Sequence, residues 1–253
     1  DLQNVKGEFL NASGGVIATG STMLISYDPS LVSQTGTLDA TVSSARLTET
    51  NAALTATGSV SLYDVDTTNV VTVSIDSVAI SGVTSGLTLT NAQVKALLVV
   101  SSTDSSALQL SKINWTFNSN TETFDWLASG EELTFTYTIL VSDGFGGTGT
   151  STVTVTVVGS NDTAVLADGV VTGAIAEGSG SLLRSGSVSF IDPDLRNTAA
   201  ALIVNDSILW SGGVLSTAQQ TDLNSAFSIT PTTIASNSGT INWTYAPTET
   251  LLD

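Results

Sequence analysis

Acidic residues that recur at the ends of two similar segments are the part of this sequence whose types and spacing could do chemistry. An Asp-x-Asp pair follows each of the segments 58–63 and 186–191; the pairs are Asp64 with Asp66 and Asp192 with Asp194. Two such carboxylates lie on the same side of an extended chain, about 6–7 Å apart, so a turn can direct both toward one hard cation. Calcium takes six to eight oxygen ligands, and Asn161 with Asp162 would add to that shell.

Turn formation is the simpler explanation for any one of these pairs, because Asp and Asn are favoured in turns. The recurrence of the whole set favours calcium instead. Two further acids recur at matching positions, namely Glu49 with Glu177 and Asp125 with Asp253. The repeated set predicts a calcium site where one repeat meets the next.

The overall composition excludes several other functions. The chain of 253 residues carries 23 acidic and 6 basic side chains and has neither His nor Cys, so it lacks an imidazole base, a zinc finger and a disulfide framework. Its net charge of −17 at pH 7 repels phosphates and anionic lipids, so we expect no nucleic acid partner and no membrane insertion. Paired carboxylates could suggest a glycosidase, but a single active site would not recur, and we expect no enzyme.

An internal repeat organises the chain. Segments 58–61 and 186–189 both read GSVS, and segments 113–116 and 241–244 both read INWT. The two members of each pair lie about 128 residues apart, a period too long for a solenoid and suited to a string of sandwich domains.

Alternating apolar residues predict the strands within a repeat. Apolar and threonine side chains alternate over 134–141, apart from Leu140, and again over 152–157, as in half-exposed antiparallel strands. The glycine-rich turn at 143–147 predicts that these two strands form a hairpin.

Capping residues predict one short helix in each repeat. The first spans 91–98 and begins after Thr90; the second spans 218–227 and begins after Ser216 or Thr217. Each repeat is therefore expected to be an all-β sandwich with one short helical insert.

The boundaries of the repeats do not coincide with the first and last residues of the sequence. We expect a leading segment over 1–35, a complete repeat over 36–162, and a second repeat over 163–253 that lacks its last two strands. Two interpretations follow: the sequence is a slice of a longer repeat array, or the leading segment of one subunit completes the trailing domain of the next by strand addition and builds a fibre.

Three motifs resemble a known family of repeats. FDWLASGEELT at 124–134, YTILVSDGFGGT at 137–148 and VTVVGSND at 155–162 look like the VCBS, or bacterial cadherin-like, repeats of giant RTX-type adhesins. The helical insert followed by Asn114-Trp115-Thr116 fits the same repeats. The resemblance covers about 36–253, and it implies immunoglobulin-like or cadherin-like sandwiches with calcium at the linkers.

The resemblance also implies where each ligand would lie. Glu49, Asp125, Asn161 and Asp162 would come from the first full repeat and be met by Asp192 and Asp194 from the second. Asp64, Asp66 and Asp143 would face the preceding repeat, and Glu177 and Asp253 the following one. Glu131 is a weaker candidate. The sequence departs from the family at Asn69 and Asn197, where a further Asp is common, and at Thr163-Ala164, where Ala-Pro is usual.

The sequence thus predicts a calcium-rigidified extender of a secreted bacterial surface adhesin, with neighbouring repeats or subunits as its end-to-end partners and a host or surface glycan as a partner elsewhere in the parent protein. The alternatives are a subunit of an extracellular fibre or surface layer joined by β-strand complementation, and a glycan-binding adhesin module. Trp115 and Trp243 recur within an alternating strand and are expected in the core, as is Trp126, whereas Trp210 has no counterpart and is the candidate for a glycan contact.

Overall fold

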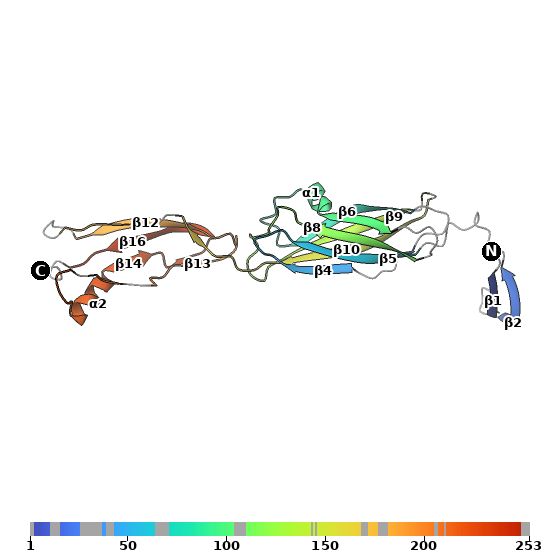
Figure 1. Cartoon of the computed structure of the whole chain (residues 1–253), viewed down its shortest axis with the longest axis horizontal. Coiled ribbons are helices and arrows are strands. Elements are labelled where there is room, and N and C mark those ends of the chain that lie inside the picture. The colour runs from blue at the N-terminus through green and yellow to red at the C-terminus, as the bar shows by residue number, and fades with distance from the viewer. Residues whose placement is uncertain are drawn as a thin grey trace.

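The computed structural model describes residues 3–10, 16–25, 37–38, 43–63, 71–103, 110–142, 144, 146–167, 172–176, 182–204, 207–209 and 211–248. Apart from two short helices, its regular elements are β-strands arranged in five sheets (Figure 1). The fold is all-β, as predicted. The predicted repeat boundaries stay a prediction, and we call the strands within 37–158 the first unit and those within 165–245 the second unit.

The first unit is a sandwich of two four-stranded sheets. One sheet has the order β4-β10-β9-β6, with β4 at Ser43–Thr48, β10 at Thr148–Val158, β9 at Glu132–Ser142 and β6 at Thr72–Gly82. The other has the order β3-β5-β8-β7, with β3 at Thr37–Leu38, β5 at Thr55–Tyr63, β8 at Leu110–Asn118 and β7 at Leu98–Thr103. The predicted hairpin is confirmed, because β9 and β10 pair antiparallel with Tyr137 opposite Val153. Strand β4 pairs with β10 in parallel.

The core of the first unit lies between its two sheets. The inward residues of β9 and β10 are fully or almost fully buried, and they meet Val60, Ile113, Trp115 and Phe117 from the facing sheet. Alternation along the strands produces this arrangement, because every second side chain points to the same face. Trp115 is a core residue as predicted, and its indole Nε1 donates a hydrogen bond to Ser43 Oγ at 2.8 Å.

A glycine–tryptophan pair explains why the two short motifs recur together. Gly58 on β5 lies directly opposite Trp115 on β8, and a Cβ on Gly58 would lie 2.4 Å from the indole Cζ2. Gly186 lies opposite Trp243 in the same way, with a Cβ predicted 2.6 Å from the indole. Each glycine therefore leaves the space that its cross-strand tryptophan fills.

Helices α1 (Asn91–Ala96) and α2 (Thr217–Ser225) each begin with a capping box. Thr90 and Ser216 are the N-cap residues, and each exchanges hydrogen bonds with a Gln three residues later. Both helices end about two residues earlier than predicted. The reason is strand pairing, since Leu98 begins β7 opposite Phe117 and Phe227 begins the next strand.

The second unit repeats one sheet of the first. Its four-stranded sheet has the order β11-β12-β16-β14, with β11 at Val165–Leu166, β12 at Arg184–Ile191, β16 at Ser238–Tyr245 and β14 at Phe227–Thr230. This order matches β3-β5-β8-β7 strand for strand. A short two-stranded sheet of β13 (Ala199–Ala200) and β15 (Thr233–Ile234) accompanies it.

The leading segment contains a hairpin of its own. Strands β1 (Gln3–Leu10) and β2 (Val16–Ile25) pair antiparallel in a separate two-stranded sheet. Within the described residues, no helix is long and apolar enough to cross a membrane.

Candidate cation site between the two units

Glu49 is placed by the parallel pairing of β4 with β10. It follows β4 directly, and its backbone N–H donates to the carbonyl of Val158 at 2.8 Å, which extends the ladder by one residue. Its side chain is only 1% exposed, and Oε1 accepts hydrogen bonds from Ser160 N at 2.8 Å and Ser160 Oγ at 2.6 Å. Because Oε1 is held by Ser160, Oε2 is fixed in a buried position with no hydrogen-bond partner in the described part of the chain.

Asp125 reaches the same region from the loop between β8 and β9. The residue before it, Phe124, is fully buried and has a φ of 64°, a left-handed conformation that costs a bulky side chain about 1–2 kcal/mol. Packing of Phe124 against Phe135 holds this conformation, with ring centroids 6.0 Å apart. The loop therefore turns sharply at Asp125, whose buried Oδ1 has no partner among the described residues.

Asp162 and Asp194 join the two units. The backbone N–H of Asp162, four residues after β10, donates to Asp194 Oδ2 at 3.2 Å. Asp162 Oδ1 accepts from Asn51 Nδ2 at 3.2 Å, and Asp194 Oδ2 accepts from Asn197 Nδ2 at 2.6 Å. The second oxygen of each carboxylate, Asp162 Oδ2 and Asp194 Oδ1, is buried and without a partner in the region described.

Three of these carboxylates converge on one place, and Asp194 lies next to them through its hydrogen bond from the Asp162 backbone. One oxygen from each of Glu49, Asp125 and Asp162 lies within 4.8 Å of the other two. Asp194 is fully buried, and its pKa is raised by that burial and by the negative charges of Asp192, Asp162 and Glu49, although its hydrogen bond from the Asp162 backbone opposes the shift. The negative charges are thus close enough to disfavour one another in the absence of a cation.

Such a cluster fits a hard cation. Its donors are carboxylate oxygens, which suit Ca²⁺ or Mg²⁺, and the chain has no His or Cys for a softer metal. Unpartnered buried oxygens normally cost free energy, and a bound cation is the group that would satisfy those of Glu49, Asp125 and Asp162 together.

Contacts outside the carboxylates also tie the units together. The backbone N–H of Leu195 donates to the carbonyl of Trp126 at 3.2 Å, and Arg196 forms an ion pair with Glu131 at 3.4 Å. Asn197 Nδ2 also donates to Asn161 Oδ1 at 3.4 Å. These contacts are few, and the Arg196 side chain is 59% exposed, so the ion pair is screened by water.

The structure brings together part of the predicted ligand set. Glu49, Asp125 and Asp162 form the cluster, and Asp194 lies beside it. Asp192 is also buried, and its Oδ1 accepts a hydrogen bond from the backbone N–H of Asp194 at 3.1 Å. Asn161 is exposed and is not bonded to the clustered carboxylates. Its Oδ1 accepts from Asn197, and its Nδ2 donates to the backbone carbonyl of Asp162. The remaining predicted ligands, Asp64, Asp66, Asp143 and Glu177, lie outside the described residues, as do Asp253 and Trp210.

Sequence reasoning missed the residues that orient the acids. Ser160 and Asn51 carry no signal, since a serine or asparagine in a Ser/Thr-rich chain is unremarkable. Asn197 did stand out in the sequence, because it occupies the position that Asn69 has in the first repeat.

Glu131, the weaker ligand candidate, is occupied by a turn and by an ion pair. Its Oε2 accepts a hydrogen bond from the backbone N–H of Ala128 at 3.1 Å, and its Oε1 pairs with Arg196. Trp126 is half-buried against the core, with its indole bonded to Glu122.

Comparisons with known proteins add little. No protein-family model matches the chain, and no curated protein matches it. Among solved structures, the cadherin-like domains 1 to 4 of zebrafish RET match with 11% sequence identity and a TM-score of 0.25, over 86% of this chain and 44% of that one.

Proposed function

We propose that the chain is a calcium-rigidified structural extender, a spacer segment of a secreted bacterial surface adhesin. The observation that carries the proposal is the set of four buried, unpartnered carboxylate oxygens between the two units, from Glu49, Asp125, Asp162 and Asp194. In this proposal the oxygens are ligands of one or more calcium ions that fix the second unit against the first.

Calcium is favoured over magnesium by the nature of the site. Magnesium requires near-ideal octahedral geometry and retains several of its waters, whereas calcium accepts six to eight oxygens in a flexible arrangement. The cluster offers buried oxygens from separate loops and strand ends, and that set suits calcium better.

The mechanical role follows from charge. Without a cation, the carboxylates repel one another across the junction, while the remaining contacts are a few hydrogen bonds and a mostly exposed ion pair. With calcium, repulsion is replaced by coordination to Glu49, Asp125 and Asp162 on one side and Asp194 on the other. The junction is then stiff with calcium and flexible without it.

The extracellular location is part of the same proposal. Extracellular calcium-binding modules have dissociation constants of ~0.1–1 mM, so a site of this class is filled outside cells and empty in a cytosol at micromolar calcium. The motifs at 124–134, 137–148 and 155–162, which resemble VCBS repeats of RTX-type adhesins, support the bacterial surface. A net charge of −17 keeps such a spacer soluble and disfavours sticking to anionic surfaces.

Thermal unfolding and small-angle scattering test the proposal together. Calcium at ten times the dissociation constant stabilises the folded state by about 1.4 kcal/mol per site, which raises the melting temperature of a unit of this size by about 5 °C. Scattering should show a narrower distribution of inter-unit distances in calcium than in chelator. Magnesium at equal ionic strength is the control for charge screening. A melt and a scattering profile that are the same in chelator, magnesium and calcium would refute the proposal.

A further inference from the structure

Three separate segments of the first unit supply the clustered acids. Glu49 follows β4, Asp162 follows β10, and Asp125 lies in the loop between β8 and β9. The ladder between β4 and β10 fixes Glu49 against the segment that carries Asp162, and the hydrogen bonds from Ser160 to Glu49 complete that link. Asp125 itself lies in no strand, so contacts of its loop must set its distance from the other two acids.

Asp125 lies in a tight turn whose two ends are anchored in the core. The backbone N–H of Leu127 donates to the carbonyl of Phe124 at 2.9 Å, which closes the turn around Asp125 and Trp126. Phe124 and Leu127 are both fully buried in the core of the first unit. Because both ends are anchored, the position of Asp125 follows the position of the backbone at Leu127.

Gly159, directly after β10, packs against the end of this turn. Its N–H donates to the carbonyl of Glu131 at 2.8 Å, and its carbonyl accepts from the N–H of Gly130 at 3.0 Å. A Cβ at this buried position would lie 2.7 Å from the carbonyl carbon of Leu127 and nearer still to the carbonyl oxygens of Leu127 and Ala128. Ordinary van der Waals contact begins at 3.4 Å, so only glycine lets the two backbones approach so closely.

Space, and not backbone conformation, requires glycine at position 159. Gly159 is not among the glycines with positive φ, so alanine could adopt its backbone angles. An added methyl would meet backbone atoms, which cannot rotate away as a side chain can, so segment 127–128 would have to move by about 1 Å. Metal ligands tolerate displacements of only about 0.2 Å. The shift would therefore take the Asp125 carboxylate out of the position that an ion shared with Glu49 and Asp162 requires.

Gly86 makes room for the side chain that follows Asp125. It lies between β6 and α1, and a Cβ there would overlap the root of the Trp126 indole. Trp126 is half-buried against the core, and its Nε1 donates to Glu122 Oε1 at 3.3 Å, so its ring is held in place. The turn around Asp125 is therefore fixed in two places, at its backbone by Gly159 and at the Trp126 indole by Gly86.

We propose that Gly159 and Gly86 are positioning residues of the candidate cation site. Each leaves the space in which an Asp125 oxygen lies within 4.8 Å of the oxygens of Glu49 and Asp162. The inference rests on the proposed function, because it assigns both glycines to the calcium site. Neither glycine offers a side-chain atom to an ion, so each acts through the turn that carries Asp125.

Calorimetric titration of the full chain with calcium is the first test. We expect Gly159→Ala and Gly86→Ala to bind calcium about 10–100-fold more weakly than the parent, the usual effect of removing a support behind the ligands. A glycine that served the fold alone would lower the stability of the first unit and leave the calcium affinity as it is. Urea unfolding of each variant in chelator supplies the comparison of stability.

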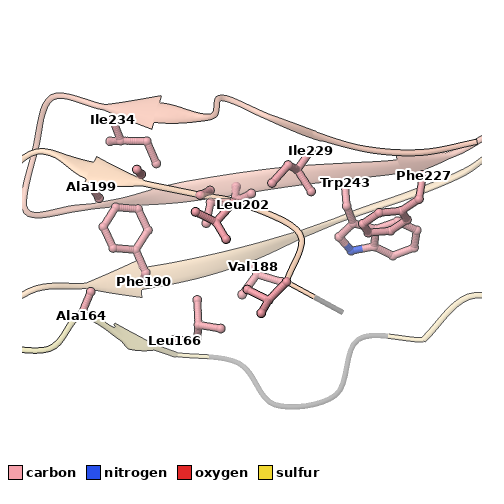
Figure 2. A pocket seen from close by; sticks show the side chains of 14 residues that line it. Ala164, Leu166, Val188, Phe190, Ala199, Leu202, Phe227, Ile229, Ile234 and Trp243 are labelled. Carbon is pink, nitrogen blue, oxygen red and sulfur yellow. The ribbon is translucent and has the colours of Figure 1, made fainter. Parts of the chain in front are cut away.

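Gly58 offers the matched control. Gly58→Ala also forces a methyl against a buried group of the first unit, the indole of Trp115, and should destabilise the unit without changing its calcium affinity. Gly186→Ala is less suitable, although Gly186 lies opposite Trp243 in the same way. Trp243 borders an apolar groove of about 420 Å³, beside Phe227, and its indole has room to move (Figure 2).

A double-mutant cycle in chelator tests the positioning without calcium. In the parent, Asp125→Asn removes a charge that Glu49 and Asp162 repel, and we expect it to lower the unfolding constant of the first unit by about tenfold. In either glycine variant the carboxylate is displaced, so the same substitution should change that constant by about twofold or less. If the glycines did not position Asp125, the effects would add, and the tenfold change would appear in every background.

The outcomes separate this inference from the proposed function. A parent that binds no calcium refutes the proposed function, and the cycle in chelator still decides the inference. A folded glycine variant that binds calcium as tightly as the parent overturns the inference, and so does one in which Asp125→Asn keeps its full effect. An equal loss of calcium affinity in Gly58→Ala also overturns it, because destabilisation alone would then explain the loss. If Gly159→Ala does not fold, Gly86→Ala carries the same test, since it displaces a side chain rather than backbone.

Discussion

Replacing Glu49 with Gln should change stability in opposite directions with and without calcium. The variant keeps an oxygen to accept the hydrogen bonds from Ser160 and loses one negative charge. The oxygens of Glu49, Asp125 and Asp162 lie within 4.8 Å of one another, and two unit charges at that distance repel by about 3 kcal/mol at an effective dielectric constant of about 20. After screening by salt and local relaxation, we expect the variant in chelator to be more stable than the parent by about 1–2 kcal/mol.

In calcium the same variant should be the less stable protein. Loss of a charged ligand weakens calcium binding, and the stabilisation that calcium gives the parent, about 1.4 kcal/mol at ten times the dissociation constant, largely disappears. Urea unfolding followed by tryptophan fluorescence measures both differences. Asp76→Asn, which neutralises an exposed carboxylate on β6, is the control and should respond equally in both buffers. If Glu49→Gln shifted stability in the same direction in chelator and in calcium, the reasoning about a charged cage would be wrong.

Three further variants test the packing that positions the site. Gly58→Ala should destabilise the first unit by about 1–3 kcal/mol, since the new methyl overlaps the locked indole of Trp115; a variant as stable as the parent in urea would show that the indole can move. Tyr137→Phe should cost about 1 kcal/mol, because the hydroxyl donates to the buried carbonyl of Val94 at 3.0 Å; an unchanged midpoint at unchanged slope would mean that the bond contributes nothing. Ser216→Ala should lower the stability of the second unit by about 1 kcal/mol and increase amide exchange in α2, and exchange that stayed the same would contradict its role as the cap.

Local signals in the sequence predicted the elements well, because each depends on neighbouring residues. The alternation around Tyr137 and the turn at 143–147 were sufficient to predict the hairpin β9–β10. Thr90 was sufficient to predict where α1 begins. Helix ends were less accurate. Leu98 belongs to β7 because of a ladder with a strand distant in sequence, and helix propensity carries no information on that.

The acidic residues of the candidate site were predicted from the sequence, whereas the residues that hydrogen-bond to them and orient them were not. Glu49 and Asp194 were identified because they recur or flank a recurring strand. The parallel pairing of β4 with β10 leaves no mark in either strand, so the bond between Glu49 and Ser160 could not be predicted from sequence. The ion pair of Arg196 with Glu131 could not be predicted either, because its two residues belong to different units and no local pattern relates them.

A crystal structure of the chain grown in millimolar calcium tests the central claim most directly. The account predicts density for an ion bound by oxygens of Glu49, Asp125 and Asp162, with Asp194 in or next to the coordination shell, at the 2.3–2.6 Å distances and six to eight ligands typical of calcium. Density for water alone among these oxygens, with the carboxylates in contact with ordered solvent, would contradict it.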